Sequence, residues 1–153
     1  MIAAMTGSPS RRTIDDLVAE ARSRIERLEP REAAAASERG ARLIDLRSET
    51  TRQRDGVIPG SLHIPRTVLE WRFDPDSEWR SPYVGGLDDH IVLFCDHGLS
   101  SSLAAATLAE IGFSRVGDII GGFHAWREAA LPTSSLRRRT PPGELPGMGP
   151  PDP

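Results

Sequence analysis

The chain has 153 residues, a formal net charge of −3 at pH 7 and a single cysteine, Cys95. This length suits one domain with short tails, and the mildly acidic balance argues against a general nucleic-acid-binding surface. One cysteine excludes an internal disulfide framework and is typical of a reducing compartment, so we expect a cytoplasmic protein. No apolar run approaches the roughly 18 residues of a membrane span, and we expect neither a signal peptide nor membrane contact.

The N-terminal part of the chain predicts a disordered end and then two helices. Residues 1–12 are rich in Gly, Ser, Pro and Arg and are expected to be disordered. Thr13 precedes two acidic residues and a set of apolar residues at helical spacing, which predicts an N-capped amphipathic helix spanning 13–28. A second helix is expected over 31–39, ended by a glycine.

Strands and helices alternate through the rest of the chain. Apolar segments predict strands over 41–47, 61–65, 91–94 and 116–120, with helices expected over 101–110 and 123–130. This alternation predicts an α/β fold, a small doubly wound and mainly parallel sheet with helices on both faces. We expect the domain to occupy 29–131 and the Pro- and Arg-rich segment 132–153 to be a disordered tail.

Cys95 lies where a reactive cysteine is expected. It follows the apolar run 91–94 and precedes a short polar loop and a helix-forming stretch. In parallel α/β sheets ligands bind outside the carboxyl ends of the strands, which is where this loop is predicted to lie. Loop N–H groups and the positive end of the helix dipole would favour the thiolate, which is the nucleophilic form. The alternative is that Cys95 is a small buried apolar residue, as many free cysteines are.

Several short motifs, taken in order, resemble the rhodanese-like domain family. They are Asp45-x-Arg47, the run from Ile58 to Pro65, Cys95-x-x-Gly98, Ile111-Gly112-Phe113 and the run from Gly121 to Trp126. The resemblance covers nearly all of 29–131. It implies a doubly wound α/β domain in which Cys95 takes a sulfane sulfur as a persulfide. That sulfur would pass to a nucleophile such as cyanide, a thiol or a protein acceptor, without a metal or organic cofactor.

The resemblance also implies an active loop from Cys95 to Ser100, whose backbone N–H groups would hold the anionic persulfide. Ser101 is expected to cap the following helix or to hydrogen-bond the thiolate. Arg47 could add a positive charge from a neighbouring strand end, although a structural ion pair is an equally strong interpretation. The substrate-binding candidates are therefore Asp96, His97, Gly98, Leu99, Ser100, Ser101 and Arg47.

The loop departs from the pattern of many thiosulfate-using members, which carry a basic residue near its end. Leu99 and Ser100 occupy those positions here. Asp96 would oppose a dianionic donor if its side chain faced the pocket. We therefore expect thiosulfate to be a poor donor, and a persulfide or an organic thiol compound to be a better one. His63 and His124 are expected to be structural or exposed.

Two other functions fit a lone thiol in this setting. A rhodanese-like binding or sensing module would accept a modification on Cys95 and show no turnover. A cysteine phosphatase shares the strand, loop and helix layout, but it needs an arginine at the position of Ser101 to clamp phosphate. The serine at that position argues against phosphatase chemistry.

Overall fold

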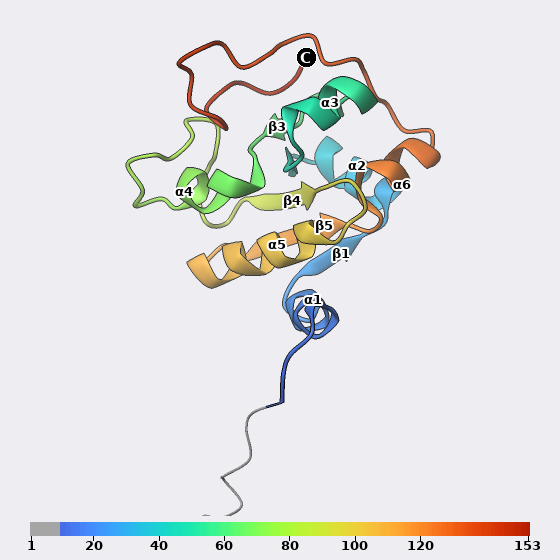
Figure 1. Ribbon diagram of the computed structural model, residues 1–153, viewed down its shortest axis with the longest axis vertical. Coiled ribbons are helices and arrows are strands. Elements are labelled where there is room, and N and C mark those ends of the chain that lie inside the picture. Colours follow the sequence, from blue (N-terminus) through green and yellow to red (C-terminus); the bar gives the residue numbers. More distant parts are fainter. Residues whose placement is uncertain (1–9) are drawn as a thin grey trace, which may run out of the picture.

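The computed structural model describes residues 10–153, and Figure 1 shows a sheet with helices on both of its faces. All neighbouring strands are parallel, in the spatial order β1-β5-β4-β2-β3. The strands are β1 (Glu26–Leu28), β2 (Arg42–Asp45), β3 (Leu62–His63), β4 (His90–Phe94) and β5 (Arg115–Ile119). The predicted α/β class with a parallel, doubly wound sheet is confirmed.

The helices are short, and within residues 10–153 none has the length and apolar character needed to cross a membrane. Thr13 begins the first of them with a reciprocal pair of hydrogen bonds to Asp16, the capping arrangement that favours this start. The helices are α1 (Ile14–Arg22), α2 (Pro30–Glu38), α3 (Glu49–Asp55), a 3-10 turn (Arg66–Val68), α4 (Leu69–Phe73), α5 (Ser100–Ile111) and α6 (Gly122–Glu128).

The side chains of β4 alternate between two apolar cores, which is why both faces of the sheet carry helices. Ile91 and Leu93 pack with apolar residues of α4 and α5 on one face. Val92 and Phe94 pack with residues of α2 and α6 on the other. Burial on both faces is typical of a central strand in a parallel sheet. The chain therefore leaves β4 at the carboxyl edge of the sheet, directly at Cys95.

The N-terminal helix is shorter than the sequence predicts. α1 ends at Arg22 rather than at residue 28, and Glu26–Leu28 forms an edge strand that pairs with β5. The apolar residues after Arg22 fit helical spacing, but strand pairing satisfies backbone groups that β5 would otherwise expose. Gly117 permits the close approach, because a Cβ there would lie 2.2 Å from the carbonyl oxygen of Glu26. The sheet thus begins before residue 29.

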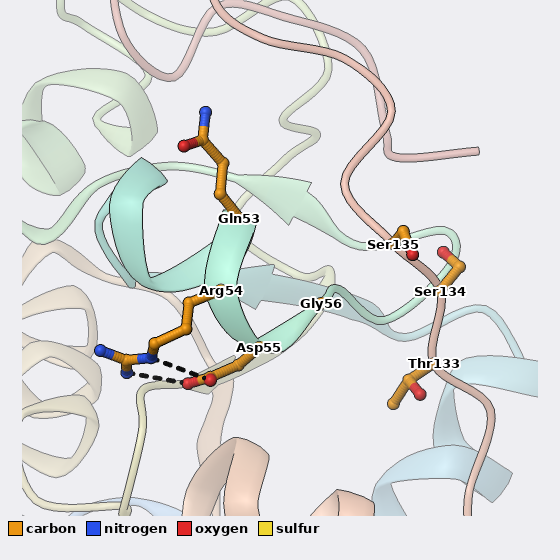
Figure 2. A pocket seen from close by; sticks show the side chains of 7 residues that line it. All are labelled: Gln53, Arg54, Asp55, Gly56, Thr133, Ser134 and Ser135. Atoms are coloured by element: carbon orange, nitrogen blue, oxygen red, sulfur yellow. Dashed lines mark hydrogen bonds and ion pairs between the residues drawn. The ribbon is translucent and has the colours of Figure 1, made fainter.

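The sequence predicts disorder at both chain ends, and residues 1–9 lie outside the described residues. Residues 132–153 contain neither a helix nor an extended strand, yet they contact the domain. Ser134 pairs with Val57 in an antiparallel bridge, and the backbone of Asp152 bonds to Gly60 and Ser61. Figure 2 shows residues 133–135 passing the end of α3, and residues of both segments line a surface pocket of about 320 Å³.

Charge balance explains why Asp152 is buried. Arg47 and Arg52 both bind the carboxylate of Asp45, which by itself leaves a surplus positive charge inside the domain. Asp152 pairs with Arg52, and both side chains are less than one-twentieth exposed. The second carboxylate makes the cluster neutral, and buried charges are tolerated only when they are compensated in this way.

We predict that Asp152→Asn lowers the free energy of unfolding by about 2–4 kcal/mol, because buried Arg52 then loses one of its two carboxylates. Urea unfolding measures the change. Glu144→Gln is the matched control in the same segment, since its ion pair with Arg138 is partly exposed. That control should cost less than about 0.5 kcal/mol. Equal losses in the two variants would contradict the charge-balance argument.

Candidate active site

Cys95 follows the last residue of β4, and its side chain is 8% exposed. The loop after it leads directly into α5, and Figure 1 shows this loop at the carboxyl edge of the sheet, close to the start of α6. The strand, loop and helix therefore follow one another as the sequence predicts. The thiol of Cys95 is buried at this edge of the sheet.

The turn before α6 fixes the backbone of the Cys95 loop. The N–H of Phe123 donates to the carbonyl oxygen of Cys95 at 2.8 Å, and the N–H of His124 donates to that of Asp96 at 3.1 Å. Gly122 has a φ of +63°, and a Cβ there would lie 2.4 Å from the Cys95 carbonyl oxygen. Only glycine fits this contact, so the Gly-Gly pair of the motif serves to dock the loop.

Gly98 aims a backbone donor at the sulfur. Its N–H donates to Cys95 Sγ at 3.2 Å. Gly98 has a φ of +80°, and a Cβ there would lie 2.8 Å from the backbone nitrogen of Gly121. A fixed N–H donor stabilises negative charge on sulfur more than it stabilises a neutral thiol. The second polar contact of Sγ is the hydroxyl of Ser101, at 3.4 Å.

A buried carboxylate lies behind the loop, and sequence reasoning missed it. Asp118 on β5 is fully buried and accepts hydrogen bonds from the hydroxyls of Ser101 at 2.8 Å and Ser102 at 2.7 Å. Its other oxygen accepts from Arg27 Nε at 2.9 Å. The sequence signal that points to Asp118 is an acidic residue within an apolar strand, because aspartate is almost never fully buried without partners.

The side chains of the loop itself point largely to solvent. His97, Leu99 and Ser100 are exposed, with Leu99 at 62%. The ring of His97 stacks on that of His124, with their centroids 4.2 Å apart. None of these loop residues carries a permanent positive charge.

A cluster of opposite charges lies beside the loop. Asp55, Asp96 and His124 bring their ligand atoms within 4.8 Å of one another, a grouping that could hold a cation. Arg54 donates to Asp55 and so holds the pKa of Asp55 below its usual value. Arg127 contacts His124. Two guanidinium groups therefore supply positive charge here, and the cluster is explained without a metal ion.

The polar contacts of the Arg47 side chain are with Asp45 and Gly56, outside the loop. Its side chain is 1% exposed and binds both oxygens of Asp45, at 2.8 and 2.9 Å. It also donates to the carbonyl oxygen of Gly56 at 2.9 Å, and its guanidinium lies 3.9 Å from the centroid of Phe123. The structural ion pair, the alternative interpretation from the sequence, describes these contacts. A buried carboxylate two residues away holds the guanidinium inside the domain.

His63 has a structural position on β3. Its Nε2 donates to the carbonyl oxygen of Arg47 at 2.7 Å. Burial, followed by the charge of Arg52, lowers the pKa of His63 below its usual value. A neutral ring protonated on Nε2 satisfies this hydrogen bond.

Comparison with known proteins identifies the family of this chain. The family model of the rhodanese-like domain matches residues 29–129. The chain belongs to the rhodanese-like domain family. The thiosulfate sulfurtransferase GlpE of Pseudomonas savastanoi pv. phaseolicola is 36% identical over 114 residues, which cover 74% of this chain and 96% of that protein. A GlpE protein of Pseudomonas fluorescens SBW25 is 34% identical over 106 residues, covering 69% and 87%. The identity and coverage of these relatives support the chain as a sulfurtransferase.

Solved structures of the family share the fold. A Rhodopseudomonas palustris protein of unknown function, named a possible tyrosine phosphatase, is 38% identical and has a TM-score of 0.75. The match covers 84% of this chain and all of that one. The polysulfide-sulfur transferase homodimer of Wolinella succinogenes, at 24% identity, has a TM-score of 0.63 over 79% of this chain and 86% of that one.

We predict that Gly98→Ala disturbs the loop more than Gly60→Ala does. Both glycines have a φ near +80°, but only at Gly98 would the new methyl group meet backbone atoms. Gly60→Ala should cost about 1–2 kcal/mol from the left-handed backbone alone, whereas Gly98→Ala should cost more and slow alkylation of Cys95. Urea unfolding and iodoacetamide kinetics test both variants. Identical behaviour would mean that the tight contact with Gly121 is unimportant.

Proposed function

We propose that this sulfurtransferase carries a sulfane sulfur as a persulfide on Cys95, between a small sulfur-containing donor and a nucleophilic acceptor. The main support is the Gly98 N–H at 3.2 Å from Cys95 Sγ, within a loop held at the carboxyl edge of the sheet. The curated relatives named thiosulfate sulfurtransferase are consistent with this chemistry. Because Cys95 is the only cysteine, no second thiol of the chain can attack the persulfide.

The transfer consists of two displacements at sulfur. The Cys95 thiolate attacks the outer sulfur of the donor, a new S–S bond forms, and the donor's bond to that sulfur breaks. The departing group keeps the electron pair, leaving as sulfite from thiosulfate or as a thiolate from a persulfide. A cyanide ion or an acceptor thiolate then attacks the outer sulfur on Cys95, and the Cys95 thiolate departs. Both steps balance without a redox cofactor or a metal.

The loop supports both anionic forms of Cys95 in this scheme. The N–H of Gly98 faces the sulfur, and α5 begins at Ser100, so the positive end of its helix dipole lies at this loop. Donors fixed before the reaction stabilise developing negative charge without reorganisation. Acceptors compatible with such an open edge are cyanide, small thiols and an exposed thiol on a protein. A reducing compartment such as the cytoplasm would keep the thiol free.

The charges at the loop favour a persulfide over thiosulfate as the donor. The exposed Leu99 offers no positive charge, and Asp96 adds a negative charge next to Cys95. A dianion approaching this loop meets no guanidinium on the loop itself. A persulfide carries less charge than thiosulfate, and its organic part can contact the exposed Leu99.

The intact mass of the purified protein tests the carrier role of Cys95. After exposure to a low-molecular-weight persulfide, the parent protein should gain one sulfur and lose it on addition of cyanide. Cys95→Ser should show no gain, because serine cannot form the persulfide. Sulfur transfer by Cys95→Ser would refute the proposal. Loading that cyanide cannot reverse would instead favour a binding or sensing module.

We predict that Leu99→Arg raises kcat/KM for thiosulfate by roughly tenfold, because a guanidinium near the loop attracts the dianion. Leu99 is 62% exposed, so the substitution should leave the core unchanged. Leu99→Gln is the matched uncharged control. Steady-state thiocyanate formation measures both variants, and the gain should shrink at high salt. Equal rates for the arginine and glutamine variants would show that charge at this position does not limit thiosulfate use.

The phosphatase alternative is raised by the name of the Rhodopseudomonas palustris relative. Phosphate transfer to a cysteine needs an arginine clamp, which the family of such enzymes places where this chain has Ser101. The Ser101 hydroxyl here donates to Asp118, and the carboxylate behind it would repel a phosphate dianion. These contacts favour sulfur transfer over phosphatase chemistry.

A further inference from the structure

Two arginines, Arg22 and Arg27, contact the Cys95 loop from α1 and β1. Both precede residues 29–129, the range that the family model matches. Arg22, in the last turn of α1, donates from one terminal nitrogen to the carbonyl oxygen of Gly98 at 2.9 Å. Its Nε donates to the hydroxyl of Ser102 at 3.1 Å. One guanidinium thus holds both the loop and the first turn of α5.

Arg27, on β1, provides the second contact. It binds the fully buried carboxylate of Asp118 at 2.9 Å, and its own side chain is 21% exposed. A second nitrogen of Arg27 lies 3.5 Å from the carbonyl oxygen of Gly98. The early end of α1 at Arg22 and the pairing of β1 with β5 are what bring these two side chains to the loop.

The contacts of Ser101 link Cys95 Sγ to the negative charge of Asp118, which the positive charges of Arg22 and Arg27 oppose. Ser101 has one hydroxyl hydrogen, and it donates that hydrogen to Asp118. Its oxygen therefore presents lone pairs to Cys95 Sγ, 3.4 Å away, and accepts the thiol hydrogen. The negative charge of Asp118 is therefore separated from Cys95 Sγ by a single hydroxyl group. Positive charge from Arg22 and Arg27 acts in the opposite direction.

Several charged or ionisable side chains lie in front of the loop. They are Asp96 and His97 on the loop, His124 and Arg127 on α6, and Arg54 with Asp55 on α3. Several of these side chains are exposed, so water and salt screen them. Arg22 and Arg27 act across a buried carbonyl group and a buried carboxylate, where water and salt screen their charges less.

We propose that Arg22 is a positioning residue for chemistry at Cys95, with Arg27 as the counter-charge of Asp118; the proposal rests on the sulfurtransferase function above. By binding the Gly98 carbonyl oxygen, Arg22 holds the loop so that the Gly98 N–H points at Cys95 Sγ. Its charge also stabilises the thiolate and the persulfide. The α1–β1 segment therefore contributes to the active site, although it precedes residues 29–129, which the family model matches.

The test compares Arg22→Gln, Arg22→Lys and the control Arg24→Gln in the full chain. Arg24 lies two residues further along and pairs with Glu20 and Glu110, away from the loop. The pH profile of Cys95 alkylation by iodoacetamide is the first readout, because it needs no sulfur transfer. Persulfide loading, followed by the rate of sulfur release to cyanide, is the second.

Arg22→Gln should slow alkylation at neutral pH by roughly three- to tenfold and move the half-maximal rate to higher pH. Arg22→Lys keeps the charge and should recover part of the loss, whereas Arg24→Gln should match the parent protein. An Arg22→Gln profile identical to that of Arg24→Gln overturns the positioning role. If the parent protein alkylates normally but never loads sulfur, the sulfurtransferase function fails while the alkylation comparison still tests Arg22.

A global loss of stability is distinguished by urea unfolding of the same variants. Arg22 is partly buried, so Arg22→Gln should unfold within about 1 kcal/mol of the parent protein. Alkylation is measured far below the unfolding midpoint. A slow rate in a folded variant then reports on the loop, whereas a rate that rises with partial unfolding would count against the proposal.

Discussion

Two fully buried aspartates flank β4, the strand that leads to Cys95: Asp45 lies at the end of β2 and Asp118 near the end of β5. A buried carboxylate is stable only when hydrogen bonds and opposite charges compensate it. On β2, the compensation comes from Arg47 and Arg52. Beside β5, it comes from Arg27 and two serine hydroxyls. This single requirement arranges two clusters of polar groups at the carboxyl edge of the sheet.

The same requirement ties both flanking segments to the domain. Asp45 alone cannot neutralise two guanidinium groups, and Asp152 from the C-terminal segment supplies the missing negative charge. Asp118 needs a cation, and β1 supplies it through Arg27. Segments that look like appendages in the sequence thus complete ion clusters whose other members lie in the matched domain. Their docking follows from electrostatics as much as from apolar burial.

Local sequence signals predicted the parts of the site that are local. The apolar run before Cys95, the glycine in the loop and the helix-forming stretch after it lie within one short segment, and the structure keeps that order. The Gly-Gly turn was recognisable from the family motif. Its reason, a close contact with the carbonyl oxygen of Cys95, becomes visible only when α6 is placed against the loop.

The parts that the sequence did not predict depend on contacts between distant residues. Arg27 and Asp118 are 91 positions apart, and Arg52 and Asp152 are 100 apart. Neither pair can be read from spacing along the chain. The end of α1 was misplaced because apolar spacing alone cannot tell a continuing helix from an edge strand. Arg47 had two sequence interpretations, and the position of Asp45 decided between them.

The cations nearest the loop backbone lie behind it, whereas its exposed face carries Asp96, His97 and Leu99. Positive charge behind the loop stabilises an anion already bonded to Cys95, but it does little to attract a free dianion from solvent. The proposed function therefore assigns stabilisation of the thiolate and selection of the donor to different residues. A substitution on the outer face can change which donor is used without altering the buried clusters that support the thiol. Under the proposed function, the reactivity of Cys95 would depend on the fold and on its flanking segments, whereas donor preference would depend on a few exposed side chains.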